Sequence, residues 1–435
     1  MDPRPDSSAT LPEPAPTRWR RLLRFAGSRG MGRALRHRQF SLFATFGWIS
    51  TIGYWVQRLG IQWLAWELTG SYAWLGIIAL AEALTLVIVM PLAGVVVDRV
   101  DRLWMARLTR FGEMLCSVVI ATVVLSGSAT PERLVVLVIM AGAAQGMWSP
   151  ARMALMPNLV PRADLTAALG VGATLFHLSH FVGPMVAGLI ITRFGVGYAF
   201  VFNATTFALF LGMLAFIREV RQEQRTHVST GYLTDISDGL RFVLGHPAIA
   251  PLMAAGALLS LFLRSYRELL AGYADGLFGA GASGLAAVAS GSGIGALTAA
   301  LMIATYARTR GLSTALLLAM ALNGVMQIGF ALAPSIEVAV AAAAGLGFLV
   351  TLGGMSAQVL LQNAIPGEKR GRVMSLWGVQ FFAGPSIGAW VTGTAANSFG
   401  LRAAIVAGTL VFFVALVVLV AKRGRLRTLE TVTAD

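Results

Sequence analysis

Charged residues are scarce in this sequence. Asp, Glu, Lys and Arg make up 12% of the 435 residues, whereas 56% are hydrophobic. This balance excludes an ordinary soluble protein, which at this length would form two or three domains with polar surfaces. The apolar residues instead form long runs, each suited to crossing about 30 Å of hydrocarbon as a helix of ~20 residues. The runs are continuous rather than alternating, so the sequence predicts an all-α membrane protein.

Cysteine is almost absent as well. The single Cys116 lies in an apolar run and excludes a disulfide within the chain. No cleavable signal peptide is visible, because the first apolar run is too long for a signal core. The sequence also lacks a G-x-x-x-x-G-K-S/T loop, an H-E-x-x-H pair and a nucleophile elbow. We therefore expect no enzyme activity, no ATP hydrolysis, no cofactor and no metal site.

The apolar runs number twelve. They lie near residues 40–66, 73–97, 104–126, 132–158, 165–192, 197–217, 247–271, 279–306, 312–333, 337–363, 373–398 and 401–421. The one long polar segment inside the chain, 218–246, divides them into two sets of six, and its apolar residues recur at a spacing that predicts a short surface helix. We therefore divide the chain into a disordered and basic tail (1–38), a six-helix bundle (39–217), a linker (218–246), a second bundle (247–421) and a tail (422–435).

The net charge of +14 is unevenly placed. Most of the 34 lysines and arginines lie in the two tails and in alternate connections between runs, and only Arg133, Arg193 and Arg402 fall in the other connections. Positive residues mark the cytoplasmic side of a membrane protein. We therefore expect both termini in the cytoplasm. The same distribution argues against nucleic acid as a partner.

The two sets of six runs resemble each other. Residues 158–161 (Asn-Leu-Val-Pro) match 363–366 (Asn-Ala-Ile-Pro). A Gly-Pro pair also recurs in the fifth and eleventh runs, as Gly183-Pro184 and Gly384-Pro385. Parallel repeats of six helices are a known transporter layout. We interpret these four residues as candidates for a hinge motif.

The connection between the second and third runs carries the pattern G-x-x-x-D-R-x-x-R. Its members are Gly94, Asp98, Arg99 and Arg102. Gly94 has no side chain, so a neighbouring helix can approach closely there. We expect this motif, together with Arg152 at the end of the fourth run, to latch a cytoplasmic gate. A plain polar stop at the end of a membrane helix is the alternative.

This motif, the twelve runs, the repeat and the cytoplasmic middle loop together resemble the major facilitator superfamily over residues 35–422. Residues 57–70 and 150–161 resemble its bacterial efflux branch, which includes enterobactin and macrolide exporters, and 183–188 resembles part of a fifth-helix motif of antiporters. The resemblance implies the major facilitator fold, with twelve transmembrane helices in two six-helix halves. It also implies a monomer in the bacterial cytoplasmic (inner) membrane. One departure is Gly142, which stands where proton-coupled members carry an arginine.

Ionisable residues inside membrane helices are costly, so they are candidates for function. Glu82 is our first candidate for proton coupling, because an apolar surrounding disfavours the charged form of a carboxyl group. His177 and His180 are further candidates, because imidazole titrates near neutral pH. A hydrogen-bonded structural glutamate and packed histidines are the alternatives. Glu113, one turn above Arg110, is interpreted as structural.

Four charged residues predict an outer gate: Arg58, Arg264, Arg267 and Glu268. Arg264 and Glu268 are four residues apart, so on a regular helix they share a face and pair. In the family that the sequence resembles, the first and seventh helices meet at the outer gate. We therefore expect these residues to form a charged gate whose pairing changes during transport. Arginines reaching towards lipid headgroups are the alternative.

Polar residues in several runs are candidates for lining a central cavity: Tyr54, Gln57, Gln145, Gln358, Gln362 and Gln380. Together with the aromatic residues of the first run, they suit an amphipathic organic solute. The expected function is secondary active transport by alternating access, with proton-coupled efflux of an amphipathic small molecule of the drug or siderophore type. The expected partners are this molecule, protons and the lipid bilayer. Import or facilitated passage of an organic solute or lipid is one alternative, and a non-transporting membrane sensor is another.

Overall fold

The computed structural model describes residues 28–97, 100–217, 232–305 and 311–431, which fold into helices joined by short turns, with no strand among them. Ten segments in these ranges are long and apolar enough to cross a membrane. Helices α3 (Arg38–Thr69) and α15 (Gly367–Phe399) are as long but contain polar side chains such as Arg58 and Gln380. With these two helices, the bundle is consistent with the twelve predicted crossings.

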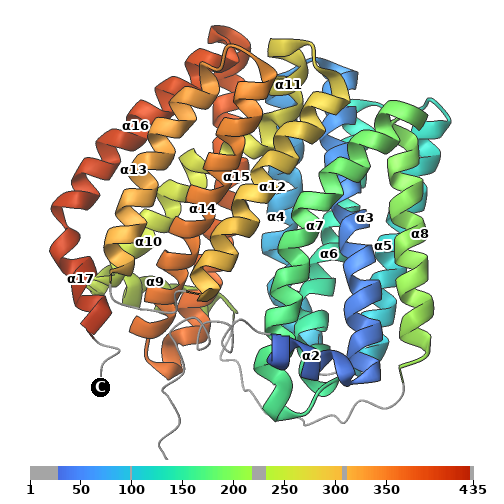
Figure 1. Cartoon of the computed structure of the whole chain (residues 1–435), viewed down its shortest axis with the longest axis horizontal. Coiled ribbons are helices and arrows are strands. Elements are labelled where there is room, and N and C mark those ends of the chain that lie inside the picture. Colours follow the sequence, from blue (N-terminus) through green and yellow to red (C-terminus); the bar gives the residue numbers. More distant parts are fainter. Residues whose placement is uncertain (1–27, 98–99, 218–231, 306–310, 432–435) are drawn as a thin grey trace, which may run out of the picture.

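The helices form two halves (Figure 1). The first half contains α3, α4 (Tyr72–Val97), α5 (Arg102–Leu125), α6 (Pro131–Leu155), α7 (Leu165–Phe194) and α8 (Val196–Ala215). The second half contains α10 (Ile249–Leu258), η3 (Leu259–Leu263), η4 (Ser265–Leu269), α11 (Leu270–Phe278), α12 (Gly281–Thr305), α13 (Leu312–Ala331), α14 (Ile336–Ala364), α15 and α16 (Leu401–Ala421). The short helices are α2 (Ser28–Arg36), α9 (Tyr232–Gly245) and α17 (Arg423–Thr431), with η1 (Met156–Asn158) and η2 (Arg162–Asp164) between α6 and α7.

The predicted runs match these helices to within a few residues, with two exceptions. The seventh crossing continues to Phe278, and the eleventh begins at Gly367. The short helix predicted in the linker corresponds to α9. Residues 1–27, 218–231 and 432–435 of the predicted tails and linker lie outside the described residues.

We call the end of the bundle where α3 ends and α4 begins the outer end, after the predicted topology. The two halves are bound to each other there. The Trp66 Nε1 group donates to Asp275 Oδ2 at 2.8 Å, and the backbone N–H of Tyr72 donates to Asn397 Oδ1 at 3.1 Å. Glycine allows the backbones to meet: a Cβ at Gly76 would lie 2.5 Å from the Trp390 Cα atom. Small residues permit such contacts between membrane helices.

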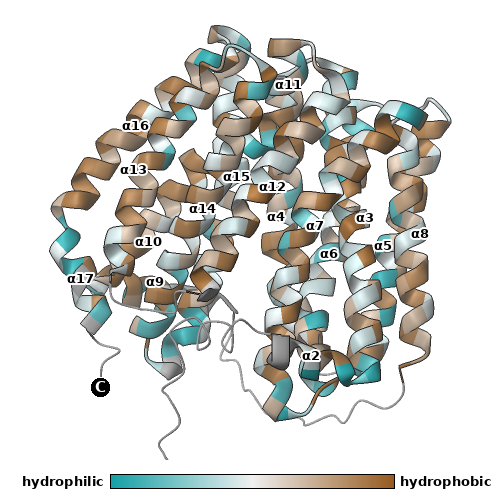
Figure 2. Ribbon diagram, viewed as in Figure 1, coloured by the Kyte–Doolittle hydropathy of each residue, from teal (hydrophilic) through white to brown (hydrophobic). Residues whose placement is uncertain are grey.

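The opposite, inner end carries α2, α9 and α17 (Figure 1). Hydrophilic residues gather on these helices, whereas hydrophobic residues follow the lengths of the longer ones (Figure 2). On α16, for example, the side chains of Val414 and Val417 are 71% and 69% exposed. In a membrane protein such surfaces face lipid, because lipid tails are as apolar as these side chains.

The repeat seen in the sequence has a structural counterpart. A Cβ at Gly183 of α7 would lie 2.4 Å from the Trp55 Cβ atom on α3. In the second half, a Cβ at Gly384 of α15 would lie 2.7 Å from the Ser260 Cβ atom on η3. In each half, therefore, a glycine beside a proline lets the fifth helix of the set pack closely against the first.

The seventh crossing is not a regular helix. Residues 259–263 form a π-helix and residues 265–269 a 3₁₀-helix, so a wide turn and a narrow turn follow each other between α10 and α11. Such irregular turns often occur at functional sites. They also change which side chains share a face, because the spacing of a regular α-helix no longer applies.

Candidate functional site

Arg58 is at the centre of the site. Its Nη1 group donates to Glu82 Oε1 of α4 at 2.9 Å, and its Nη2 group donates to Glu268 Oε1 of η4 at 2.8 Å. Glu82 belongs to the same half as Arg58, whereas Glu268 belongs to the other half. The side chains are largely buried, with 22%, 16% and 10% exposure for Arg58, Glu82 and Glu268. One guanidinium therefore connects three helices and both halves.

Two neighbours on α3 complete this network. The Tyr54 hydroxyl accepts a hydrogen bond from Arg58 Nη1 at 3.3 Å, and Gln62 Nε2 donates to Glu268 Oε2 at 3.2 Å. Residues four apart lie on one face of an α-helix. Tyr54, Arg58 and Gln62 thus form a polar stripe on α3. Through Arg58 and Gln62, this stripe contacts Glu268 of the second half.

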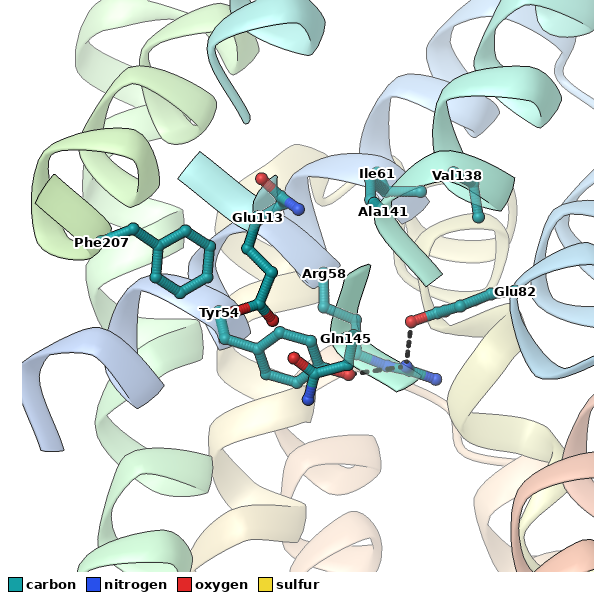
Figure 3. Close-up of a pocket in the computed structure, with 10 residues that line it drawn as sticks. Tyr54, Arg58, Ile61, Glu82, Glu113, Val138, Ala141, Gln145 and Phe207 are labelled. Atoms are coloured by element: carbon teal, nitrogen blue, oxygen red, sulfur yellow. Dashed lines mark hydrogen bonds and ion pairs between the residues drawn. The ribbon is translucent and has the colours of Figure 1, made fainter. Parts of the chain in front are cut away.

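A small cavity lies beside the network (Figure 3). Its volume is about 20 Å³. It is lined by Tyr54, Gln57, Arg58, Ile61, Glu82, Glu113, Val138, Ala141, Gln145 and Phe207. A space of this size accommodates about one water molecule rather than an organic substrate. Hence Glu82 of α4 and Glu113 of α5 line the same water-sized space, whose surface is otherwise mainly apolar.

Glu113, interpreted as structural from the sequence, forms an ion pair with Arg110, one turn away on α5. Arg110 Nη1 and Glu113 Oε2 are 2.8 Å apart, and both side chains are almost fully buried. The Arg110 guanidinium lies over the Trp148 ring at 3.6 Å from its centroid. Stacking of this kind stabilises a buried cation. Through this stacking, the pair on α5 is joined to α6 within the first half.

The predicted pairing of Arg264 with Glu268 was wrong. Glu268 binds Arg58 and Gln62, whereas the Arg264 guanidinium lies over the Phe381 ring at 3.8 Å. The prediction assumed a regular helix, but Arg264 lies at the junction of the π-helix and the 3₁₀-helix. Arg267 does not meet Glu268 either: its Nη2 group donates to Ser292 Oγ on α12 at 3.0 Å.

The candidate histidines on α7 contact aromatic side chains. The His180 ring packs edge-on against Trp55, with centroids 4.4 Å apart, and the His177 ring packs against Phe176. His180 Nδ1 is buried and has no hydrogen-bond partner among the described residues. Of the three predicted proton-coupling residues, only Glu82 takes part in the ion-pair network around Arg58.

The predicted cavity residues also separate. Tyr54, Gln57 and Gln145 line the water-sized cavity of the first half. The Gln57 side-chain oxygen is already occupied, because it accepts hydrogen bonds from Ser117 Oγ and Asn203 Nδ2 at 2.8 and 2.9 Å.

The other three residues are in the second half. Gln358 is half-buried and Gln362 is exposed, both on α14. The Gln380 amide on α15 packs against Gly256 of α10. Three of the six predicted cavity residues therefore line the water-sized cavity beside the network, and the other three lie on α14 and α15.

The predicted cytoplasmic gate motif is only partly visible, because Asp98 and Arg99 lie outside the described residues. Arg102 Nη1 donates to the Ala154 carbonyl at 3.4 Å, near the inner end of α6 that also carries Arg152. The close helix approach predicted at Gly94 was wrong for this conformation, because a Cβ there would have no atom within 4 Å.

Several contacts were missed in the sequence. Asp275 and Asn397 bind the first half at the outer end, and Glu430 of α17 accepts hydrogen bonds from Gly311 N and Ser313 N at the start of α13. The corresponding helix of the first half, α5, is capped by Asp101, the residue directly before it, which accepts a hydrogen bond from Trp104 N. The sequence does show polar residues at the ends of apolar runs. Their partners could not be predicted from it, because they are far away in the chain.

Two bundles of membrane-crossing helices, with an ion-pair network connecting the halves near one end, define the fold of a multi-pass membrane transporter. The chain belongs to the transmembrane secretion effector family of the major facilitator superfamily, whose profile matches residues 33–434. This confirms the family resemblance and the major facilitator fold. The family and its relatives below are transporters rather than enzymes.

Curated relatives include an uncharacterised transporter, YfiS of Bacillus subtilis, which is 28% identical over 46% of this chain and 48% of its own length. The aligned region thus spans about half of that relative. The multidrug efflux pump Tap of Mycolicibacterium fortuitum is 25% identical over 80% of this chain and 87% of its own. The enterobactin exporter EntS of Escherichia coli is 29% identical over 66% and 68%.

A solved structure with the same fold is that of a point mutant of the peptide transporter POT. It superposes with a TM-score of 0.71 over 90% of this chain and 95% of its own, at 15% identity. A bacterial homologue of the lysosomal transporter Spinster, in an inward-facing and occupied conformation, gives 0.69 over 88% and 96%, at 14% identity. At these identities the likeness concerns the fold alone.

Proposed function

We propose that this protein is a secondary active transporter that exports an amphipathic small molecule, of the drug or siderophore type, from the bacterial cytoplasm in exchange for protons. Its relatives Tap and EntS are named as efflux proteins, which supports the direction and the type of substrate. The positive charges on alternate connections support an orientation in the cytoplasmic membrane with both termini inside.

The observation that carries this proposal is the bridge from Arg58 to Glu82 and Glu268. A buried ion pair becomes strongly unfavourable when one partner loses its charge, because the other is left uncompensated. Protonation of Glu268 therefore weakens the contact between the halves at the outer end, and Glu82, which shares the Arg58 guanidinium, remains to balance the charge of Arg58. In this scheme Glu268 takes up a proton while the outer end is open, and the ion pair with Arg58 forms again when the proton leaves to the inside after helix packing has closed the outer end.

The predicted gate then has a definite composition. Arg58, Glu268 and Glu82 form its charged part, and Trp66 with Asp275 forms a second contact nearer the outer end. Gly183-Pro184 and Gly384-Pro385 are placed where each half's fifth helix meets its first, so they suit a hinge on which these helices pivot. Arg102 and Arg152 belong to the opposite, cytoplasmic gate.

The test is transport of fluorescent amphiphiles in proteoliposomes with an imposed pH gradient. Glu82→Gln keeps the shape of the side chain but cannot be charged, so it is expected to abolish the dependence of flux on the gradient. Glu337→Gln is the matched control, because Glu337 is exposed at the start of α14. Flux that follows the gradient equally in Glu82→Gln and wild type contradicts proton coupling through Glu82.

A further inference from the structure

Two arginines inside the bundle have no acidic partner. Arg264 and Arg267 lie on the irregular seventh crossing, and neither forms an ion pair with any carboxylate in the described part of the chain. The Nε atoms of both are buried and lack an acceptor there. The Arg264 guanidinium lies over the face of Phe381, and Arg267 donates to the Ser292 hydroxyl.

This arrangement is costly. Charged groups within a membrane bundle normally pair with one another, because an isolated charge in an apolar medium is strongly disfavoured. The acidic residue nearest to them in the sequence, Glu268, has both of its oxygens engaged, one by Arg58 and one by Gln62. Its charge reaches Arg264 across a distance but forms no ion pair with it, so both guanidinium groups keep free hydrogen-bond donors among the described residues.

The first half adds hydrogen-bonding groups. His177 and His180 of α7 are close enough to Arg267 to interact with its charge, and His180 also interacts with Arg264 and Arg58. His180 Nδ1 has no hydrogen-bond partner in the described ranges, so the neutral ring can donate a hydrogen bond to an anion. Arg58, Glu82 and Glu268 together carry one surplus negative charge, whereas Arg264 and Arg267 carry two positive charges and pair with no carboxylate of the described ranges. The five groups therefore leave one net positive charge, which a bound anion can neutralise with donors from both halves.

Aromatic faces accompany these donors. The centroid of the Trp55 ring lies 4.4 Å from that of His180 and 6.0 Å from that of Phe176, and Phe176 and Phe381 remain 44% and 38% exposed. Flat apolar rings next to guanidinium groups provide both parts of a site for an amphipathic anion. The guanidinium forks bind a carboxylate or sulfonate, and the rings contact an aromatic or aliphatic body.

We propose that Arg264 and Arg267, with His180 from the other half, bind the acidic group of the transported molecule, so that the substrate is an amphipathic organic anion. This inference rests on the proposed transport function and specifies its substrate class. Because the binding groups come from both halves, the anion also draws the halves together around itself.

The test compares two dyes with the same xanthene ring system and opposite charge, fluorescein and rhodamine 123. Fluorescence polarisation with the purified full chain in nanodiscs gives the affinity for each. Wild type is expected to bind fluorescein at least about tenfold more tightly than rhodamine 123. Arg264→Gln/Arg267→Gln is expected to lose about 10- to 100-fold in fluorescein affinity, because charge-assisted hydrogen bonds disappear. Arg264→Lys/Arg267→Lys keeps the charges and retains part of the preference.

Arg133→Gln is the matched control, since this arginine lies at the exposed start of α6. Equal affinity for both dyes, binding of neither dye, or an unchanged preference in the double glutamine variant overturns the proposal. If the double glutamine variant does not fold, the proposal is tested by whether wild type and the double lysine variant bind fluorescein more tightly than rhodamine 123. Gradient-driven flux of rhodamine 123 without fluorescein binding removes the anion site and leaves the transport function standing.

Discussion

The guanidinium of Arg58 is 2.8 Å from the carboxylate of Glu268, a residue of the opposite half and 210 positions away in the sequence. This contact joins the first crossing of one half to the first crossing of the other, at the polar stripe of α3. Helix packing and the hydrogen bond from Trp66 to Asp275 also close the outer end. The ion pair is the contact between two opposite charges in that closure, and protonation of Glu268 weakens it.

The first prediction concerns the role of Arg58 as a shared partner. Arg58→Ala leaves Glu82 and Glu268 buried without a counter-charge, so we expect a loss of about 3–5 kcal/mol in stability. Arg58→Lys keeps the charge but lacks the planar fork that reaches two carboxylates. It is expected to retain more stability while transport falls at least tenfold.

Thermal unfolding in detergent and dye flux measure these two effects. Arg58→Ala combined with Glu82→Gln and Glu268→Gln removes all the charges of the network together. We expect this triple variant to recover stability relative to Arg58→Ala alone. A triple variant less stable than Arg58→Ala shows that the charges do not act as one network.

The second prediction concerns the bond between Trp66 and Asp275 at the outer end. Trp66→Phe removes the indole N–H that donates to Asp275 but retains an aromatic ring. Since one such bond contributes about 1 kcal/mol, the outer end is expected to open several-fold more often. Reaction of a cysteine replacing Ala274, which is fully buried one residue before Asp275, with a polar maleimide in the Cys116→Ser background measures this opening. The same labelling rate in Trp66→Phe and the parent argues against a clamp.

The third prediction separates two glycines on one helix. A Cβ at Gly183 would lie 2.4 Å from the Trp55 Cβ atom, whereas a Cβ at Gly170, also in α7, would meet nothing within 4 Å. Gly183→Ala is therefore expected to lower the melting temperature and slow transport, and Gly170→Ala to change neither. In α15, Gly384 and Gly378 provide the same comparison. Equal effects at the two positions of a pair rule out close packing as their function.

The fourth prediction concerns Glu430, which caps α13 from the C-terminal helix. Glu430→Ala leaves the N–H groups of Gly311 and Ser313 without their carboxylate acceptor. Loss of a helix cap costs typically ~1 kcal/mol, so a small decrease in melting temperature is expected. Glu337→Ala serves as a comparison, since its carboxylate lies at the start of α14 but on the exposed surface. A larger decrease in Glu337→Ala contradicts the capping role.

The helices and the family were predictable from the sequence, because a helix that crosses a bilayer requires a long apolar run and such runs are visible directly. The partners of charged residues were not. Arg58 and Glu268 were both predicted as gate residues. The expected bond between Arg264 and Glu268, however, depended on a regular helix that residues 259–269 do not form. Glu113 shares a cavity with Glu82 because α4 and α5 both pack against α6. The spacing of residues within one helix does not predict such packing between helices.

The central claim, that the two halves pivot and open the outer end when the Arg58 bridge is lost, is tested most directly by distances between spin labels. One pair joins Glu67 to Ala403 near the outer end, and a second joins Ala163 to Ser375 near the inner end, in wild type and in Glu268→Gln. We predict that Glu268→Gln lengthens the outer distance and shortens the inner one. Two distances that both stay unchanged, or that lengthen together, contradict the claim.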